Sequence, residues 1–286
     1  MFIVINKKII ITAVLCIFIA SVCASVTFYS MPVQTGTVQI KLPIIMYHGL
    51  MEKEDRQNEY MIDPEFFEQD LEYLSDNGYN TIFLSELTDY FEKGTPLPEN
   101  PVIITFDDGY LNNYTYAYPI LKKYKTKAVI SPIGLSADDA ENEEYRSPLW
   151  SQCTWQQLKE MSDSGLVEIQ NHTYNLHKLT GNSRGAAAKS GESYEEYKKR
   201  LSIDLMTAND RIEKETGTKP CTFVYPFGAK SEYTEEIVRS LGFKAILDCE
   251  NKMNHISDKE DLFHLHRFLR PNNLSAEEFF GEIMNK

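Results

Sequence analysis

Two adjacent aspartates, Asp107 and Asp108, are the residues of this sequence that most clearly suggest chemistry. They directly follow the apolar run Val102–Phe106, which is typical of a strand covered on both faces. A carboxylate at such a place must be paired or must bind a cation, because an isolated buried charge is unstable. Gly109 allows a tight turn that would direct both side chains to one point. A helix N-cap is the alternative, but it would explain one aspartate better than two.

Two histidines follow another apolar run in the same way. His172 and His177 lie directly after the segment Leu166–Gln170. Two imidazoles and one carboxylate, with positions left open for water, form a catalytic rather than a structural metal site. The spacing of the histidines is not specific, and a lone histidine is more often structural. The hypothesis of a metal site therefore rests on their combination with the aspartate pair.

Two later segments carry further candidates. Tyr225-Pro226-Phe227-Gly228 combines turn-forming residues with aromatic rings, so it predicts a wall that contacts a sugar, a pocket rich in backbone amides, or an ordinary turn.

The second segment is Phe263–Phe268, which we interpret as a strand. Alternation along a strand would put His264 and His266 on one face and Arg267 on the other. One of the histidines is then a candidate general acid, and a surface strand without a catalytic role is the alternative.

Strands and helices must position these candidate residues, and the sequence predicts that the two kinds of element alternate. From Leu42 onward, short apolar runs alternate with amphipathic stretches for about seven or eight units, which is typical of a parallel α/β fold and suggests a barrel. Working residues in such folds lie at the carboxyl ends of strands, where the clusters fall. The expected strands are Pro43–Tyr47, Thr81–Leu84, Val102–Phe106, Ala128–Ser131, Leu166–Gln170, Cys221–Val224, Lys244–Leu247 and Phe263–Phe268.

A long helix is marked by apolar residues three and four positions apart. We interpret this stripe as core packing and not as a ligand site; it comprises Tyr194, Tyr197, Leu201, Leu205, Ala208 and Ile212. The preceding segment Lys178–Gly191 is rich in Gly, Ala, Ser and Lys, and we expect it to be a mobile insertion.

The first 29 residues predict a membrane segment. Lys7 and Lys8 precede the uncharged run Ile9–Tyr29, which is the order of an export signal and exceeds the roughly 20 residues that cross a bilayer. We favour an uncleaved anchor over a signal peptide cleaved after Ala24. In either case, we expect the remainder on the extracellular face of a bacterial cell membrane or secreted. Residues 30–41 read as a linker and residues 42–286 as one catalytic domain.

Composition excludes some classes of function. The net charge of −13 would repel phosphate backbones, so no nucleic acid partner is expected. Only Cys153, Cys221 and Cys249 lie beyond the N-terminal apolar run, and the total of five is odd, so the chain is not a disulfide scaffold. We expect a monomer whose membrane contact is the N-terminal segment.

Taken in order, the motifs resemble those of the polysaccharide deacetylases of carbohydrate esterase family 4, which share the NodB-homology domain. The resemblance extends over roughly Pro43 to Pro271 and implies a distorted, incomplete (β/α) barrel. His177 follows His172 by five positions, where many members have four. This longer step and the segment Ile44–Gly49 resemble the subgroup that acts on poly-N-acetylglucosamine.

The resemblance implies a role for each candidate. Asp107 corresponds to the catalytic base, and Asp108, His172 and His177 to the ligands of one divalent ion, zinc first, with cobalt, nickel, iron or manganese as alternatives. We favour His266 over His264 as the general acid. We expect the substrate or the oxyanion to meet the turn residues Tyr225, Pro226 and Phe227.

The sequence departs from the family pattern at one position. Many members carry an arginine just before the Pro-containing turn, where this chain has Val224 or Tyr225. We hypothesise that Arg267 or Arg270 supplies that charge. His48, at the end of the first predicted strand, either faces the cleft or is structural.

The implied function is metal-dependent removal of N-acetyl groups from a cell-surface or wall polysaccharide that contains N-acetylglucosamine. Two alternatives remain at this stage. One is a pseudoenzyme that binds carbohydrate without turnover, which the missing arginine favours slightly. The other is an esterase that removes O-acetyl groups from wall sugars with the same residues.

Overall fold

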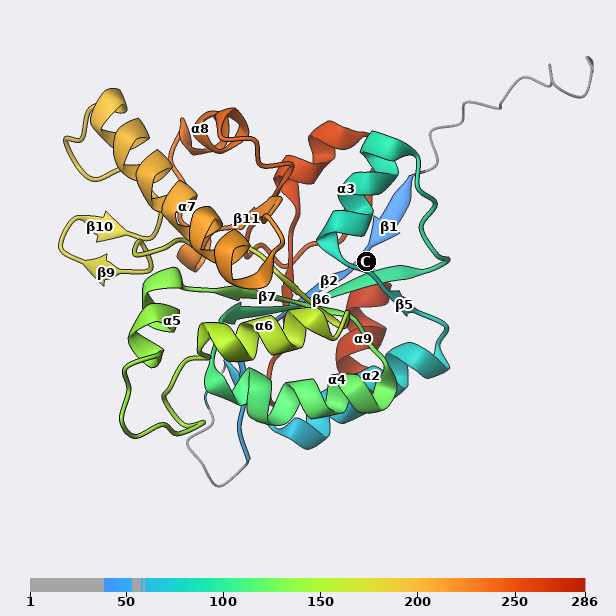
Figure 1. The fold of residues 1–286 in the computed structure, drawn as a ribbon. Helices are drawn as coiled ribbons and strands as arrows, with labels where there is room; N and C mark the ends of the chain where they lie inside the picture. Colours follow the sequence, from blue (N-terminus) through green and yellow to red (C-terminus); the bar gives the residue numbers. More distant parts are fainter. Residues whose placement is uncertain (1–38, 53–57, 59, 286) are drawn as a thin grey trace, which may run out of the picture. The chain divides into compact units, whose positions relative to one another are not determined.

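The central sheet consists of parallel strands in the part of the chain that the computed structural model describes, residues 39–52, 58 and 60–285. Its order is β14 (Phe268–Leu269), β2 (Ile44–Tyr47), β6 (Pro101–Asp108), β7 (Ala128–Pro132) and β8 (Val167–Ile169), and β5 (Asn80–Thr81) also pairs with β6. The predicted membrane segment, residues 1–29, and most of the predicted linker lie outside the described residues. Figure 1 shows β2, β6 and β7 at the centre.

A second parallel pair continues this arrangement. Strands β11 (Thr222–Val224) and β12 (Ala245–Leu247) form a ladder of their own. Single bridges join β8 to β11 through Asn171 and Phe223, and β12 to the segment before β14 through Leu247 and Leu265. The predicted α/β fold of parallel strands is therefore confirmed. A closed barrel is not, because these two junctions are single bridges and not ladders.

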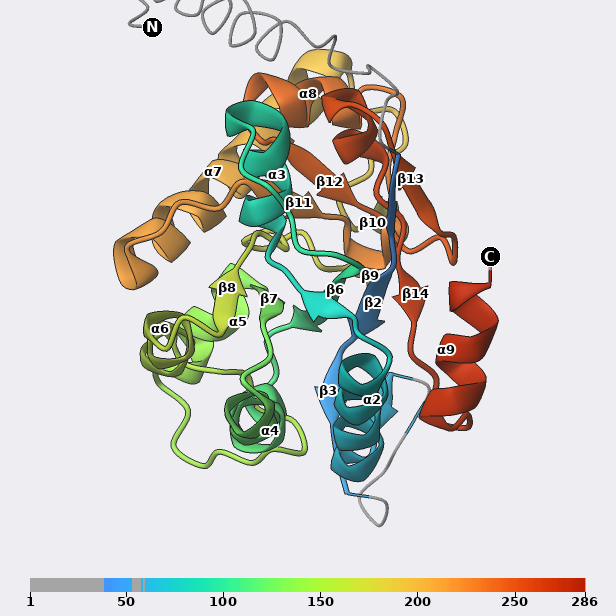
Figure 2. The ribbon, with the colours of Figure 1, turned by 90° about the vertical axis from the view of Figure 1, so that its right-hand side faces the viewer.

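Alternate residues of the strands enter two different clusters of the core. Ile45, Ile104 and Ile130 pack on the side covered by helices α2, α4 and α6, whereas their neighbours Ile44, Ile103 and Val129 pack with the residues of β11 and β12. Such continuous apolar runs are expected where both faces of a strand are covered. Figure 2 shows α3, α7 and α8 on the side opposite to α2, α4 and α6.

Four α-helices in the described part of the chain begin at a side-chain cap. Asp63, Thr154, Ser193 and Ser275 each accept a backbone N–H in the first turn of the helix that follows, as is usual for these residue types. None of the helices in the described part of the chain is both long and apolar enough to span a bilayer. The helices are α2 (Pro64–Asp76), α3 (Leu84–Lys93), α4 (Tyr118–Tyr124), α5 (Gly134–Ala140), α6 (Trp155–Asp163), α7 (Tyr194–Thr216), α8 (Thr234–Ser240) and α9 (Ala276–Met284).

The predicted strand Phe263–Phe268 is wrong. Residues Lys259–His264 form a 3-10 helix, and β14 begins only at Phe268. Asp258 starts this helix because its carboxylate accepts the N–H of Glu260, while the Asp261 carboxylate accepts the N–H of Asp258. The alternation assumed for His264 and His266 does not apply to a helix and the turn after it.

Three smaller differences concern the linker, the second predicted strand and the predicted insertion. Ile40 and Lys41, predicted in the linker, belong to β1 (Ile40–Leu42), which pairs antiparallel with β13 (Asn254–Ile256). The predicted strand Thr81–Leu84 stops early, because the Glu168 carboxylate accepts the N–H groups of Leu84 and Ser85 and starts α3. The predicted insertion contains a hairpin of β9 (Leu179–Thr180) and β10 (Ser183–Arg184).

A buried ion pair joins α2 to the C-terminal segment. Asp70 accepts hydrogen bonds of 2.8 Å from Nε and Nη2 of Arg270 and from the Tyr47 hydroxyl. Arg270 donates through Nη1 to the carbonyl groups of Pro271 and Leu274. All three side chains are buried, so the charge of each ion is compensated only by the other members of this group.

The first prediction concerns this pair. Arg270→Met should lower the free energy of unfolding by about 3–5 kcal/mol, because it leaves the Asp70 carboxylate buried without a cation. Urea titration of the purified protein measures the change. Lys159→Met, which removes one partner of the exposed pair Lys159–Asp163, should change it by about 0–1 kcal/mol. Equal losses in the two variants would contradict the prediction.

Candidate active site

Asp107 and the three predicted metal ligands, Asp108, His172 and His177, meet at one cavity of about 770 Å³. His48 follows β2, Asp107 and Asp108 end β6, and His172 follows β8, and all four line this cavity. Because these strands are parallel, their carboxyl ends lie at the same edge of the sheet. His177 and Phe227 also line the cavity. Ligand sites in α/β sheets are expected at this edge.

Asp108, His172 and His177 converge on one point. Asp108 Oδ1 lies 3.4 Å from His172 Nε2 and 3.2 Å from His177 Nε2. This oxygen is buried and accepts no hydrogen bond from the described residues. Burial opposes ionisation of Asp108, but the two imidazoles outweigh burial and lower its pKa. The carboxylate is therefore charged, and its free oxygen points to a place where a cation would sit.

The hydrogen bond of His172 favours a metal-binding tautomer. Its Nδ1 lies 2.9 Å from the carbonyl oxygen of Val224. A carbonyl only accepts, so Nδ1 carries a proton, and in the neutral ring Nε2 is then the nitrogen with the free lone pair. Metal-ligating histidines are usually oriented in this way. Two imidazoles and a carboxylate suit a divalent transition metal, and the three ligand atoms lie within 4.8 Å of one another. The residues present therefore fit such an ion.

The backbone at the ligands is unusual. Asp108 has φ of 68° and Thr173 has φ of 73°, in the left-handed region that residues with a Cβ seldom adopt. Such conformations persist where surrounding contacts enforce them and are common in active sites. Gly109 also has positive φ, and a Cβ there would lie 2.7 Å from Cβ of Pro132. Only glycine fits at this turn.

Asp107 is held by an arginine. Arg267 donates from Nη1 and Nη2 to the two oxygens of Asp107 at 2.7 and 2.8 Å, and both side chains are buried. Burial is the largest single effect and would raise the pKa of Asp107, but the charge and hydrogen bonds of Arg267, together with the nearby histidines, outweigh it and lower the pKa. The hypothesis that Arg267 or Arg270 supplies the missing charge is thus confirmed for Arg267, whereas Arg270 pairs with Asp70.

His48 also lines this cavity, and one nitrogen of its imidazole has no hydrogen-bond partner among the described residues. Its Nδ1 is buried and makes no hydrogen bond to the described residues, and its ring packs against that of Tyr60 at a centroid distance of 4.9 Å. Burial lowers the pKa of His48, and the carboxylates of Asp107 and Asp108 oppose that effect. The sequence left its role open between the cleft and the structure, and its position is in the cleft.

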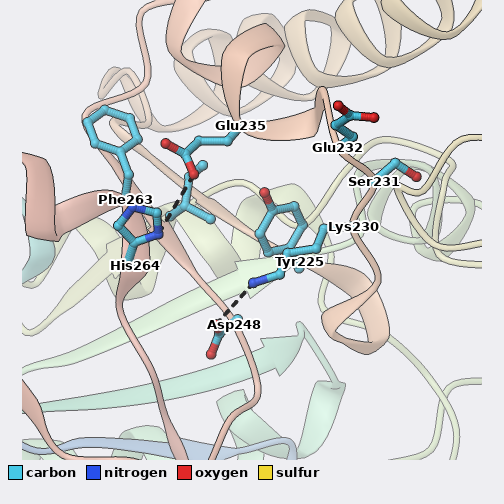
Figure 3. A pocket seen from close by; sticks show the side chains of 9 residues that line it. Tyr225, Lys230, Ser231, Glu232, Glu235, Asp248, Phe263 and His264 are labelled. Carbon is cyan, nitrogen blue, oxygen red and sulfur yellow. Dashed lines mark ion pairs between the residues drawn. The ribbon is translucent and has the colours of Figure 1, made fainter.

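His264 and His266 do not line this cavity. His264 lines a second cavity of about 430 Å³, and its side chain is 60% exposed and lies 3.7 Å from Glu235. His266 Nδ1 lies 3.0 Å from Asp248 Oδ1. Figure 3 shows the second cavity, with His264 directed at Glu235 and Lys230 directed at Asp248.

The turn Tyr225–Phe227 separates the two cavities. The Tyr225 side chain lines the second cavity, as Figure 3 shows, and its N–H donates to the carbonyl of Leu247 at 3.0 Å. Pro226 has no N–H. Phe227 lines the first cavity, where its ring packs on His177 at a centroid distance of 4.2 Å. Its N–H donates to no backbone or side-chain acceptor in the described part of the chain. Of the three predicted residues, Phe227 alone offers a free N–H.

Comparison with known proteins supports the motif assignment. Residues 94–246, more than half of the chain, match the sequence pattern of the polysaccharide deacetylase family. The chain belongs to this family.

The chain is 26% identical over 258 residues to a poly-beta-1,6-N-acetyl-D-glucosamine N-deacetylase of Escherichia coli K12, covering 84% of this chain and 38% of that protein. A Staphylococcus aureus protein of the same name is 29% identical over 193 residues, covering 68% of this chain and 62% of the relative. The chain thus spans less than two thirds of either relative.

Solved structures of the family share the fold. A de-N-acetylase from Aggregatibacter actinomycetemcomitans superposes with a TM-score of 0.70 at 28% identity, covering 85% of this chain and 99% of that one. IcaB from Ammonifex degensii superposes with a TM-score of 0.65 at 27% identity, covering 80% and 91%. The family resemblance read from the motifs is therefore confirmed.

The metal site yields the second prediction. Zn²⁺ added at one hundred times its dissociation constant should stabilise the metal-free protein by about 2.7 kcal/mol, because only the folded chain assembles the three ligands. Thermal unfolding with and without Zn²⁺ measures the effect. His172→Ala should abolish it, and His255→Ala, at an exposed position of β13, should preserve it. Equal stabilisation of both variants would remove His172 from the site.

Proposed function

We propose that the chain is a metal-dependent hydrolase that removes N-acetyl groups from N-acetylglucosamine units of a surface or wall polysaccharide. One observation carries the proposal: Asp107, which is paired with Arg267, lines the same cavity as the triad of Asp108, His172 and His177. Amide hydrolysis needs a base next to a Lewis acid, and this arrangement offers both. The names of the Escherichia coli and Staphylococcus aureus relatives support this substrate class.

Asp107 serves as the general base in this proposal. Arg267 keeps the carboxylate charged and fixes its orientation, while each oxygen retains a further lone pair to accept a proton from water. A divalent ion held by Asp108, His172 and His177 would polarise the acetyl carbonyl and acidify a water molecule, as zinc does in hydrolases. Asp107 therefore needs only modest basicity, which agrees with its lowered pKa.

Two other groups complete the reaction. The Phe227 N–H is free and belongs to a residue that lines the cavity, so it would donate to the oxyanion that develops on the acetyl oxygen. We assign His48 as the general acid that protonates the leaving nitrogen. Its lowered pKa makes the charged ring a stronger proton donor than an exposed histidine. The products are acetate and a glucosamine unit.

The third prediction tests the base. Asp107→Asn should lower acetate release from poly-N-acetylglucosamine by about 10²-fold or more, the scale of general base catalysis, and should leave zinc affinity within a few-fold of the wild type. His172→Ala should lose both activity and zinc binding. Chromatographic measurement of acetate and zinc competition with a chromogenic chelator give the two readouts. Full turnover by Asp107→Asn would refute the assignment.

The fourth prediction separates the candidate acids. His48→Gln should reduce turnover by about 10²-fold or more, whereas His266→Gln and His264→Gln should change it by less than about threefold, because neither lines the cavity. An acetylated substrate whose leaving amine is less basic than that of glucosamine depends less on protonation of the nitrogen, so it should recover much of the rate of His48→Gln. The reverse order of losses would return the acid role to His266.

The alternatives are weighed by the same residues. The pseudoenzyme rested on a missing arginine, and Arg267 meets that requirement, which supports turnover. No observation favours an O-acetyl esterase, and acetate release from a panel of N- and O-acetylated polymers decides between the activities.

We also propose extracellular action with an N-terminal anchor. This proposal rests on Lys7, Lys8 and the apolar run that follows them.

A further inference from the structure

The loop between the two histidine ligands is held by side chains along its whole length. Four consecutive N–H groups, those of residues 173–176, donate to side-chain oxygens. Thr173 N–H donates to Asn171 Oδ1, and Leu176 N–H donates to Thr173 Oγ1. Two acceptors thus come from the loop or its edge, but the middle of the loop depends on another element.

That element is α7. The carboxylate of Asp204 accepts the N–H of Tyr174 through Oδ1 at 2.8 Å and the N–H of Asn175 through Oδ2 at 2.9 Å. One side chain therefore binds two adjacent peptide groups halfway between His172 and His177. A carboxylate offers a separate oxygen to each peptide group, whereas an amide in the same orientation would present one oxygen and one NH2 donor.

The opposite side of the loop rests on α5. The N–H of Gly134 donates to the Thr173 carbonyl, and the N–H of Leu135 donates to the Tyr174 carbonyl. The contact is close: a Cβ on Gly134 would lie 2.7 Å from Cδ2 of Tyr174 and 3.3 Å from its Cα. The loop is therefore held between α5 and α7, and among the described residues the Asp204 carboxylate accepts from the two peptide groups in its middle.

We propose that Asp204 is a positioning residue of the metal site, which holds His177 at ligand distance from His172 by fixing the two peptide groups between them. His172 has its own restraint, the Nδ1 contact with Val224. No side-chain hydrogen bond to the His177 ring is formed by the described residues; the ring packs on Phe227, and the backbone must supply the rest of its orientation. This proposal is about metal binding. It rests on the proposed function only where it predicts a change in turnover.

The fifth prediction tests this role with an isosteric change. Asp204→Asn should weaken zinc binding by the metal-free protein by about tenfold or more, the scale seen when groups that orient metal ligands are removed. The matched control is Asp210→Asn, at an exposed position of the same helix, which should bind zinc as the wild type does. Competition with a chromogenic chelator gives both dissociation constants.

A second variant perturbs the loop from the other side. Gly134→Ala should also weaken zinc binding, because the added methyl group displaces Tyr174. The visible absorption spectrum of Co²⁺-loaded Asp204→Asn should differ from that of the wild type in intensity, which reports altered ligand geometry. Thermal unfolding of the metal-free variants identifies any general loss of stability, which would lower the midpoint without altering the cobalt spectrum.

The outcomes distinguish this inference from the proposed function. A zinc dissociation constant for Asp204→Asn within twofold of that for Asp210→Asn, with an unchanged cobalt spectrum, would overturn the role of Asp204 and leave the enzyme assignment intact. A wild type that binds zinc but releases no acetate would overturn the enzyme assignment alone. Excess zinc should restore turnover to Asp204→Asn but not to His177→Ala, since only the latter lacks a ligand.

Discussion

Two adjacent carboxylates must be kept charged inside the protein, and the rest of the site is arranged around this constraint. Asp107 is 2% exposed and Asp108 is 6% exposed, so water cannot stabilise either charge. Arg267 compensates Asp107 with two hydrogen bonds, and the two histidines converge on Asp108. Each carboxylate thus has its own partners, and in the proposed function one serves as a base and the other as a metal ligand.

Strand geometry explains how neighbouring residues face the same cavity. Successive side chains of a strand point to opposite faces, and Asp107 and Asp108 would do so if β6 continued in extended form. The positive φ of Asp108 and of Gly109 ends the extended conformation between the two aspartates, and Gly109 fits only because it has no Cβ near Pro132. The local strain is enforced by β7, which pairs with β6 up to Pro132.

The sequence was sufficient to bring Asp107 and the three candidate metal ligands together, but it could not identify the arginine partner of Asp107 or place His48 in the site. The aspartates and histidines follow buried runs directly, so local pattern was sufficient. Arg267 could not be separated from Arg270 because the distinction depends on Asp70, an α2 residue 200 positions away from Arg270. The candidate acids His264 and His266 were placed on a predicted strand, where the structure has a capped 3-10 helix that ends at His264, and neither lines the cavity that His48 lines. Barrel closure likewise depends on pairings between distant segments, and two of these are single bridges.

Helix α7 has an apolar stripe that predicts core packing, and polar residues beside this stripe contact the site. Leu201, Leu205 and Ala208 were predicted as core residues, and all three are buried. Asp204 and Asn209 lie beside the stripe, where polar residues would ordinarily face solvent. Instead, Asn209 accepts from the Asn171 side chain and Asp204 accepts from the loop. The apolar contacts fix the position of the helix, and that position lets Asp204 reach two peptide groups between His172 and His177 and lets Asn209 reach the Asn171 side chain. One element therefore contributes both to the core and to the contacts around the two histidines.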